Sequence, residues 1–172
     1  MLKSLTQNIL PIVPDNFVVP TSKDFANFKL EILNKNHLLL DYKAVMESIK
    51  KIKGVFGSYE PNWPSNDLTL EDDLSDLNWH YQEFERRTSF TYTVLSLDNL
   101  QCLGCVYIFP SDKKEYGTIV FLWVNSNGIL TTQDLYKNIK DWLTSSWPFS
   151  KIGYPGIEIN WNEWDALPNK TS

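Results

Sequence analysis

The sequence predicts an α/β (α+β) domain with a mixed, mostly antiparallel central sheet and helices on both faces. Three observations support this fold class. Short alternating segments typical of strands follow one another over residues 90–124. Segments with apolar residues at helical spacing lie before and after them. Residues 119–124 are apolar at every position, as expected for a central strand that is covered on both faces.

The first half of the chain is predicted to contain an arm, a short strand and two helices. Residues 1–27 hold several prolines and show no clear period, so we expect a surface arm. Residues 28–33 alternate apolar and charged side chains, which predicts a strand with one wet face. Helical periodicity covers 38–52 and then 70–87. The second of these helices carries a polar stripe that we expect to face solvent. The stripe consists of Asp73, Asp76, His80, Glu83 and Arg87.

The second half predicts a strand meander followed by a βαβ unit. Strands near 90–96, 101–109 and 116–124 are joined by short connections, so we expect them to be antiparallel neighbours. A helix over 132–145 leads into a strand over 152–159. The two strands of such a unit are parallel and joined by a right-handed crossover.

Length and composition fit a single domain over residues 1–172. A chain of 172 residues, 42% of them hydrophobic, can bury a full core. The formal net charge of −5 argues against a nucleic-acid partner, because phosphate contacts need a basic surface. The longest wholly apolar run, 119–124, is far short of the ~20 residues that cross a bilayer, so no membrane partner is expected. The N-terminus lacks the pattern of a signal peptide, and we expect a cytoplasmic protein.

Cys102 and Cys105 form a C-x-x-C motif, a spacing known from redox and zinc sites. The motif lies within a predicted strand, where residues three apart face opposite sides of the sheet. We do not expect the two histidines of the chain to supply the further ligands of a zinc site. We therefore expect two reduced core cysteines on opposite sheet faces, and no metal.

The loop over residues 125–132 is a candidate ligand site. Ligands in open α/β sheets bind outside the carboxyl ends of strands, where neighbouring strands part. A helix that begins there offers unpaired N–H groups to an anion. The alternative is an ordinary connection in which Gly128 takes a positive φ.

Several short stretches carry a resemblance to a known family. They are Phe28-Lys-Leu-Glu-Ile, Asp41-Tyr, Leu68-Thr-Leu-Glu-Asp-Asp-Leu, Phe90-Thr-Tyr-Thr-Val-Leu, Leu103-Gly-Cys-Val-Tyr-Ile, Leu122-Trp-Val, Asp141-Trp-Leu and Trp147-Pro-Phe. Together with the order of the predicted elements, they resemble the GNAT acetyltransferase superfamily, and within it a bacterial GNAT-like family. The resemblance extends from about Phe17 to Trp164.

The resemblance implies an acetyl-CoA-dependent N-acyltransferase that acts on a small-molecule or peptide amine. Acetyl-CoA would be a cosubstrate, with its pantetheine paired to the strand over 119–124 and its diphosphate on the following loop. The cofactor-binding candidates are Leu122, Trp123, Val124, Asn125, Gly128, Thr131 and Thr132. The loop departs from the family pattern Gln/Arg-x-x-Gly-x-Gly/Ala. The expected Arg and two glycines fall on Ile129, Thr132 and Asp134, and Asp134 would place a negative charge close to a diphosphate.

The same resemblance yields catalytic candidates. His80 and Glu83 are candidate bases, three apart on a helix that helps form the acceptor cleft in the family. Tyr107 and Trp123, on neighbouring strands, are candidates to line an acceptor pocket, although aromatic residues in strands are often ordinary core. The degenerate loop favours an alternative, a non-catalytic binding or structural module with the GNAT fold that has lost CoA binding. A homodimer also stays open.

Overall fold

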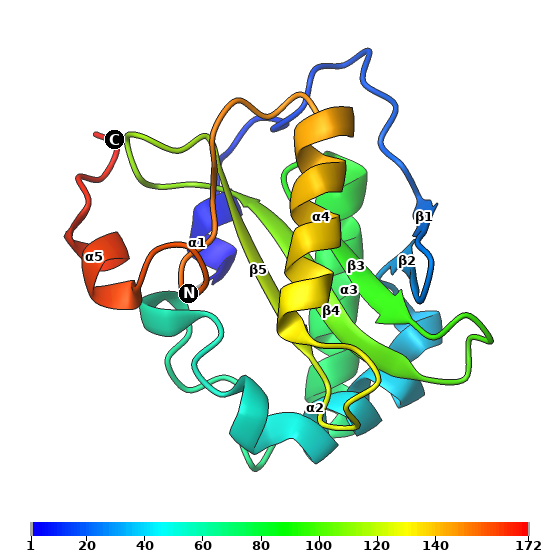
Figure 1. Ribbon diagram of the computed structural model, residues 1–172. Coiled ribbons are helices and arrows are strands. Elements are labelled where there is room, and N and C mark those ends of the chain that lie inside the picture. The colour runs from blue at the N-terminus through cyan, green and yellow to red at the C-terminus, as the bar shows by residue number, and fades with distance from the viewer. Residues whose placement is uncertain (1, 172) are drawn as a thin grey trace.

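The computed structural model describes residues 2–171, and its centre is one six-stranded sheet whose strands lie in chain order (Figure 1). The strands are β1 (Ser22–Asp24), β2 (Lys29–Ile32), β3 (Phe90–Leu95), β4 (Cys102–Pro110), β5 (Thr118–Val124) and β6 (Ile152–Gly153). Successive strands pair antiparallel as far as β5, and β6 pairs parallel to β5. The predicted α/β class, with its mixed and mostly antiparallel sheet, is confirmed.

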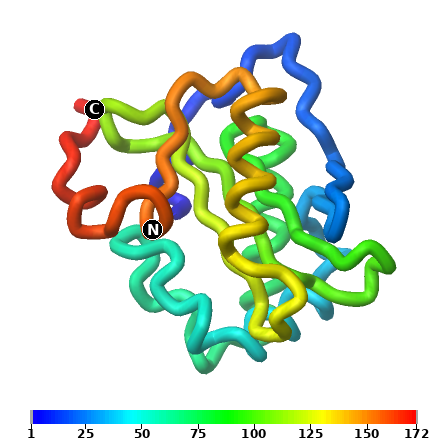
Figure 2. Tube along the Cα trace, in the orientation of Figure 1, coloured from blue at the N-terminus to red at the C-terminus, as the bar shows by residue number. Residues whose placement is uncertain are grey.

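Helices cover both faces of this sheet (Figures 1 and 2). They are α1 (Leu2–Thr6), α2 (Leu38–Ile52), α3 (Leu70–Arg86), α4 (Thr132–Ser146) and α5 (Trp161–Ala166). Helix α4 packs on one face, against β5, whereas α2 and α3 pack on the other, against β4 and β3. None of the helices within residues 2–171 is long and apolar enough to span a membrane.

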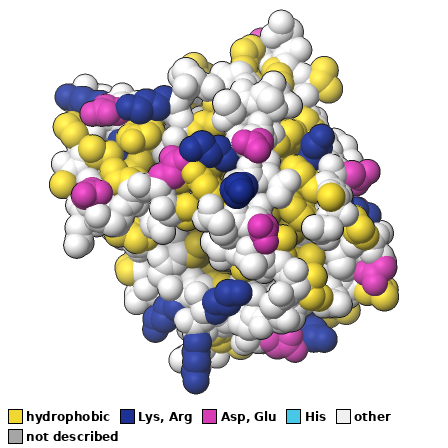
Figure 3. Space-filling model, in the orientation of Figure 1, with side chains coloured by type: hydrophobic (Ala, Val, Ile, Leu, Met, Phe, Trp, Pro, Cys, Tyr) yellow, Lys and Arg dark blue, Asp and Glu magenta, His cyan; other side chains and the backbone are white. Residues whose placement is uncertain are grey.

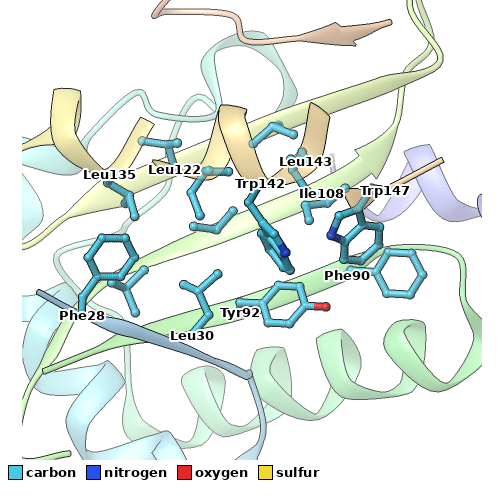
Figure 4. Packing of buried hydrophobic residues seen from close by; sticks show 14 of the residues in the cluster. Phe28, Leu30, Phe90, Tyr92, Ile108, Leu122, Leu135, Trp142, Leu143 and Trp147 are labelled. Atoms are coloured by element: carbon cyan, nitrogen blue, oxygen red, sulfur yellow. The ribbon is translucent and has the colours of Figure 1, made fainter. Parts of the chain in front are cut away.

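The core between α4 and the sheet is built from aromatic and branched aliphatic side chains (Figure 4). Trp142 of α4 points at the ring of Tyr92, with ring centroids 5.6 Å apart. Trp147, just after the helix, lies 5.4 Å from Trp142 and 5.2 Å from Phe90. The contacts of Trp142 with Tyr92 and Trp147 are edge-to-face, and such contacts stabilise the core beyond the area that the rings bury. They fix α4 across β3–β5, so that its N-terminus lies near the end of β5.

Helix α3 begins with a capping box. The Thr69 hydroxyl accepts a hydrogen bond from the Asp72 N–H at 3.1 Å, and the Asp72 carboxylate accepts one from the Thr69 N–H at 3.1 Å. The predicted solvent-facing polar stripe is wrong, because Asp73, His80 and Glu83 are buried. These side chains turn toward the sheet and toward α2. Polar residues elsewhere in the chain supply hydrogen-bond partners for two of them, which makes their burial tolerable.

The two cysteines lie on one face of the sheet, which contradicts the expectation of opposite faces. Val94 pairs with Gly104 and Leu95 pairs with Cys102, so Leu103 is the extra residue of a β-bulge. The bulge shifts the alternation by one residue, and both Cys102 and Cys105 pack with the core on the α2 and α3 side. Both thiols are free and buried, and burial raises the pKa of each.

Two segments at the sheet edges differ from the prediction. The strand expected over 152–159 is only two residues long, because Pro155 and a turn with Gly156 at φ +79° follow it. The arm expected over residues 1–27 contains α1 and also β1, which pairs with β2 at the sheet edge. Short polar segments such as Ser22–Asp24 carry too little apolar pattern to be recognised as strands.

Candidate functional site

A groove opens where β5 and β6 separate. The two strands pair only at Thr118 with Ile152 and at Ile119 with Gly153, while β5 continues to Val124. The groove has a volume of about 250 Å³. It is lined by residues 51–55 after and at the end of α2, 121–124 of β5, Thr132 at the start of α4, residues 155–157, and Trp161 of α5.

The backbone edge of β5 faces this groove. The N–H of Asn125 donates toward β4, to the Leu103 carbonyl at 2.8 Å, whereas the N–H of Thr118 donates toward β6, to the Lys151 carbonyl at 3.3 Å. Backbone groups alternate in direction along a strand. The N–H groups of Val120, Leu122 and Val124 therefore point to the β6 side, beyond the two pairs that β6 makes. An extended molecule in the groove can pair with this edge as a strand would.

An aromatic pair closes one end of the groove. The rings of Phe121 and Trp161 are stacked, with centroids 6.3 Å apart and planes at 9°. Two glycines make room for the Trp161 indole. A Cβ on Gly57 would lie 2.3 Å from it, and a Cβ on Gly156 would lie 2.9 Å away.

The other end of the groove lies at the N-terminus of α4. Thr131 is the N-cap, and its hydroxyl accepts from the Asp134 N–H at 3.0 Å and donates to the Asp134 carboxylate at 2.7 Å. Asp134 does not line the groove; it lines a separate cavity together with Phe25 and Asn138. Gly128 takes a φ of +78° and has open space where a Cβ would be.

The charge in the groove comes from α2. Among residues 2–171, Lys51 and Lys53 are the charged side chains that line it. The Lys51 ammonium donates to the Asn125 carbonyl at 2.6 Å, at the end of β5. In Figure 3 basic side chains gather at the lower left of the molecule, over the C-terminal end of α2.

His80 lies in the core between α3 and the sheet, where it is only 2% exposed. Its Nδ1 is 3.0 Å from the Thr91 hydroxyl, and its Nε2 is 3.3 Å from an Asp76 carboxylate oxygen. The imidazole is 5.4 Å from the ring of Tyr107. Both ring nitrogens thus have protein partners.

Glu83 and Tyr107 are buried as well. The Glu83 carboxylate accepts from the Thr88 hydroxyl at 2.6 Å and from the Arg86 guanidinium at 3.2 Å. The Tyr107 hydroxyl accepts from the Trp123 indole N–H at 3.1 Å. Burial raises the pKa of Tyr107. Phe56 packs edge-on against Tyr107 and Phe121, with centroids 4.9 and 5.3 Å away.

No protein-family model matches the sequence, and no curated protein does. Solved structures do match. The ribosomal-protein-S5-alanine acetyltransferase of Vibrio fischeri aligns with 78% of this chain and 73% of its own, at a TM-score of 0.55 and 10% identity. The microcin C7 self-immunity acetyltransferase MccE, solved with acetyl-CoA and AMP, aligns with 76% of this chain and 68% of its own, at a TM-score of 0.56 and 11% identity. FdhC, a nucleotide-linked sugar GNAT, aligns with 79% of this chain and 72% of its own, at a TM-score of 0.52 and 10% identity.

This chain has the GNAT fold. Identities near one residue in ten establish the fold alone, so the activity has to be argued from the site. Within the GNAT fold of this chain, the groove lies at the carboxyl end of β5, where parallel strands part and where ligands of open α/β sheets commonly bind.

The structure brings some of the predicted site residues together and separates others. Leu122, Trp123, Val124 and Thr132, four of the candidates for cofactor binding, line one groove. Asn125 is buried beside it, where its amide donates to the Cys102 carbonyl at 2.8 Å. The residues predicted for catalysis or for the loop that do not line the groove are His80, Glu83, Tyr107, Asn125, Gly128 and Thr131.

Sequence reasoning missed the lysines and Trp161. Lys51 and Lys53 follow the core stripe of α2 and look like an ordinary charged helix end. Trp161 reaches the groove only because α5 folds back against η2 (Gly57–Tyr59). No local pattern in the sequence predicts either placement.

Replacement of His80 is expected to affect stability rather than ligand affinity. His80→Gln should lower the free energy of unfolding by about 1–3 kcal/mol, because a buried network loses part of its hydrogen bonding. Any affinity for acetyl-CoA that the wild type shows in calorimetry should change by less than about twofold in the variant. Tenfold weaker binding by a folded variant would show that His80 contacts acetyl-CoA.

Proposed function

We propose that this chain binds acetyl-CoA in the groove between β5 and β6 and transfers the acetyl group to an amine of a small molecule or peptide. The observation that supports this most directly is the free backbone edge of β5, which runs through the groove toward the N-terminus of α4. MccE, which shares the fold, was solved with acetyl-CoA.

The groove suits part of acetyl-CoA. Its volume of about 250 Å³ is slightly below the ~300–1,000 Å³ of typical small-molecule pockets. Within residues 2–171, the part of β5 that lines the groove has no strand paired to its β6 side, the walls are mostly apolar, and the charged lining side chains are basic. These features fit the pantetheine arm of acetyl-CoA, which is narrow, carries amide groups and is joined to the diphosphate.

The proposed reaction needs little from side chains. The amine nitrogen bonds to the acyl carbon, the carbon–sulfur bond breaks, and CoA leaves as a thiolate that takes up a proton. The proton that the amine loses goes to solvent, since the groove is lined by no Asp, Glu or His within the described residues. An N–H of β5 that points into the groove is suited to hold the negative charge that develops on the acyl oxygen.

A second candidate is a module that binds acetyl-CoA without transferring its acetyl group. The burial of His80, Glu83 and Tyr107 favours it, because all three side chains are engaged in core hydrogen bonds. The two candidates share the groove and differ only in turnover.

Binding and turnover can be measured separately. Titration calorimetry with acetyl-CoA tests the groove, and release of the CoA thiol tests transfer to a peptide N-terminus or a small primary amine. Val55→Trp, at a half-buried lining position, should weaken binding at least tenfold by filling the groove. Leu39→Trp, at an exposed position of α2, is the matched control.

The outcomes distinguish the acyltransferase from the binding module. Binding with thiol release that depends on the amine supports the acyltransferase. Binding without release in the presence of any amine supports the binding module. If the wild-type protein produces no heat at millimolar acetyl-CoA, the proposed site is wrong.

A further inference from the structure

Two lysines at the C-terminal end of α2 and just after it supply positive charge to the groove wall. Lys51 and Lys53 both line it, and neither forms a salt bridge with a carboxylate within residues 2–171. No acidic side chain lines the groove in the described part of the chain. The charged side chains that line the groove are therefore positive, although the net charge of the whole chain is −5.

Lys51 is held beside the β5–α4 loop by its hydrogen bond of 2.6 Å to the Asn125 carbonyl. An ammonium group has three donors, and this bond uses one of them. Asn125 is itself fixed, since its side-chain amide donates to Cys102 and its backbone N–H donates to Leu103. The Lys51 ammonium is thus held at the end of β5, in a groove that Thr132 of α4 also lines, and it has two further donors that could bind a phosphate.

The loop itself supplies no basic side chain. Residues 125–131 read Asn-Ser-Asn-Gly-Ile-Leu-Thr, without Lys or Arg. Asp134, the nearest charged residue along the chain, accepts a hydrogen bond from the N-cap residue Thr131 and lines another cavity. Positive charge at this end of the groove has to come from a different element, and α2 is the element that provides it.

We propose that Lys51 and Lys53 bind the diphosphate of CoA, so that α2 takes over the role of a basic loop residue. This inference rests on the proposed function, because it assigns residues to the same groove. Lys51 is the stronger contact, since its ammonium is already fixed at the loop. Lys53 adds a second charge along the groove wall.

The test compares lysine variants and CoA derivatives in binding titrations. Lys51→Gln should weaken CoA binding about tenfold, and Lys53→Gln about threefold. Lys51→Arg should retain most of the affinity, because it keeps the charge. The matched control is Lys50→Gln, which makes the same change of net charge at a neighbouring exposed position of α2 outside the groove.

Dephospho-CoA, which lacks the 3′-phosphate but keeps the diphosphate, locates the contact. The inference expects Lys51→Gln to weaken CoA and dephospho-CoA by the same factor. A loss confined to CoA would place the lysine at the 3′-phosphate and overturn the inference. Circular dichroism of each variant verifies that the loss of the bond to Asn125 leaves it folded.

The remaining outcomes separate this inference from the proposed function. If the wild type binds CoA and both lysine variants behave like Lys50→Gln, the groove binds CoA but the lysines do not hold its diphosphate. If the wild type binds neither CoA nor dephospho-CoA, the proposed function and the inference fall together.

Discussion

Trp164→Ala is expected to lower the free energy of unfolding by about 3–5 kcal/mol, the range for a large aromatic side chain removed from a core. Trp164 is fully buried, although it lies only eight positions before the end of the chain. Its indole N–H donates to the Tyr59 hydroxyl at 3.0 Å, and its ring is 4.9 Å from that of Tyr116. A Cβ on Gly153 would lie 2.5 Å from the indole, so β6 is shaped around this side chain.

Urea denaturation of the wild type, Trp164→Ala and Trp161→Ala measures this effect. Trp161 belongs to the same helix but is only half-buried, so its removal should cost less than half as much. Equal losses for the two variants, or a loss below about 1 kcal/mol for Trp164→Ala, would contradict the assignment of Trp164 as the anchor of the C-terminal segment.

Asp73→Asn is expected to stabilise the protein at pH 8 and to have little effect at pH 4. Asp73 is buried on α3, and its Oδ2 has no hydrogen-bond partner among the described residues. Burial raises its pKa to about 7, with a further increase from Asp76 and an opposing effect of His80. Asp41 of α2 faces the same cluster, and burial raises its pKa too.

The direction of the pH effect on stability follows from proton binding by Asp73. Between about pH 4 and 7 the folded state keeps the Asp73 proton that the unfolded state loses, so the stability that this carboxyl contributes falls as pH rises. A change in pKa from 3.8 to about 7 corresponds to at most about 4 kcal/mol. Solvent screening lowers this to about 2 kcal/mol.

Unfolding measured from pH 4 to pH 8 isolates this contribution as a difference between variant and wild type. The difference should grow to about 2 kcal/mol in favour of Asp73→Asn. Asp141→Asn, on the exposed face of α4, should give a difference that does not change with pH. A flat difference for Asp73→Asn would mean that this carboxyl titrates at an ordinary pKa.

The elements with regular patterns were predictable from sequence. The bounds of α2 are those that its apolar stripe indicates, and the meander β3–β4–β5 follows from alternation and short turns. Each of these signals is local. The bulge at Leu103 was not predictable, because it depends on how β4 pairs with β3 rather than on β4 alone.

The main error of the sequence-based prediction was to place buried polar residues of α3 in solvent. The spacing of Asp73, His80 and Glu83 places them on one face of α3, but it does not say whether that face meets water or other polar groups. Thr91 and Thr88 supply partners for His80 and Glu83 from outside the helix. The residues of β5 that line the groove were predictable from sequence. Those at the end of α2 were not, because a helical pattern does not say which other element the helix end meets.

The order of the strands has a consequence for how the chain folds. Within residues 2–171, each strand pairs only with its neighbours in sequence, although α2 and α3 lie between β2 and β3, and α4 lies between β5 and β6. Loop-closure entropy grows with loop length, so the meander β3–β4–β5 closes at little entropic cost, whereas the pairing of β2 with β3 costs more. The bond from Trp164 to Tyr59 is different, since it joins residues 105 positions apart. The C-terminal segment that completes the groove therefore requires the costliest closure in chain entropy.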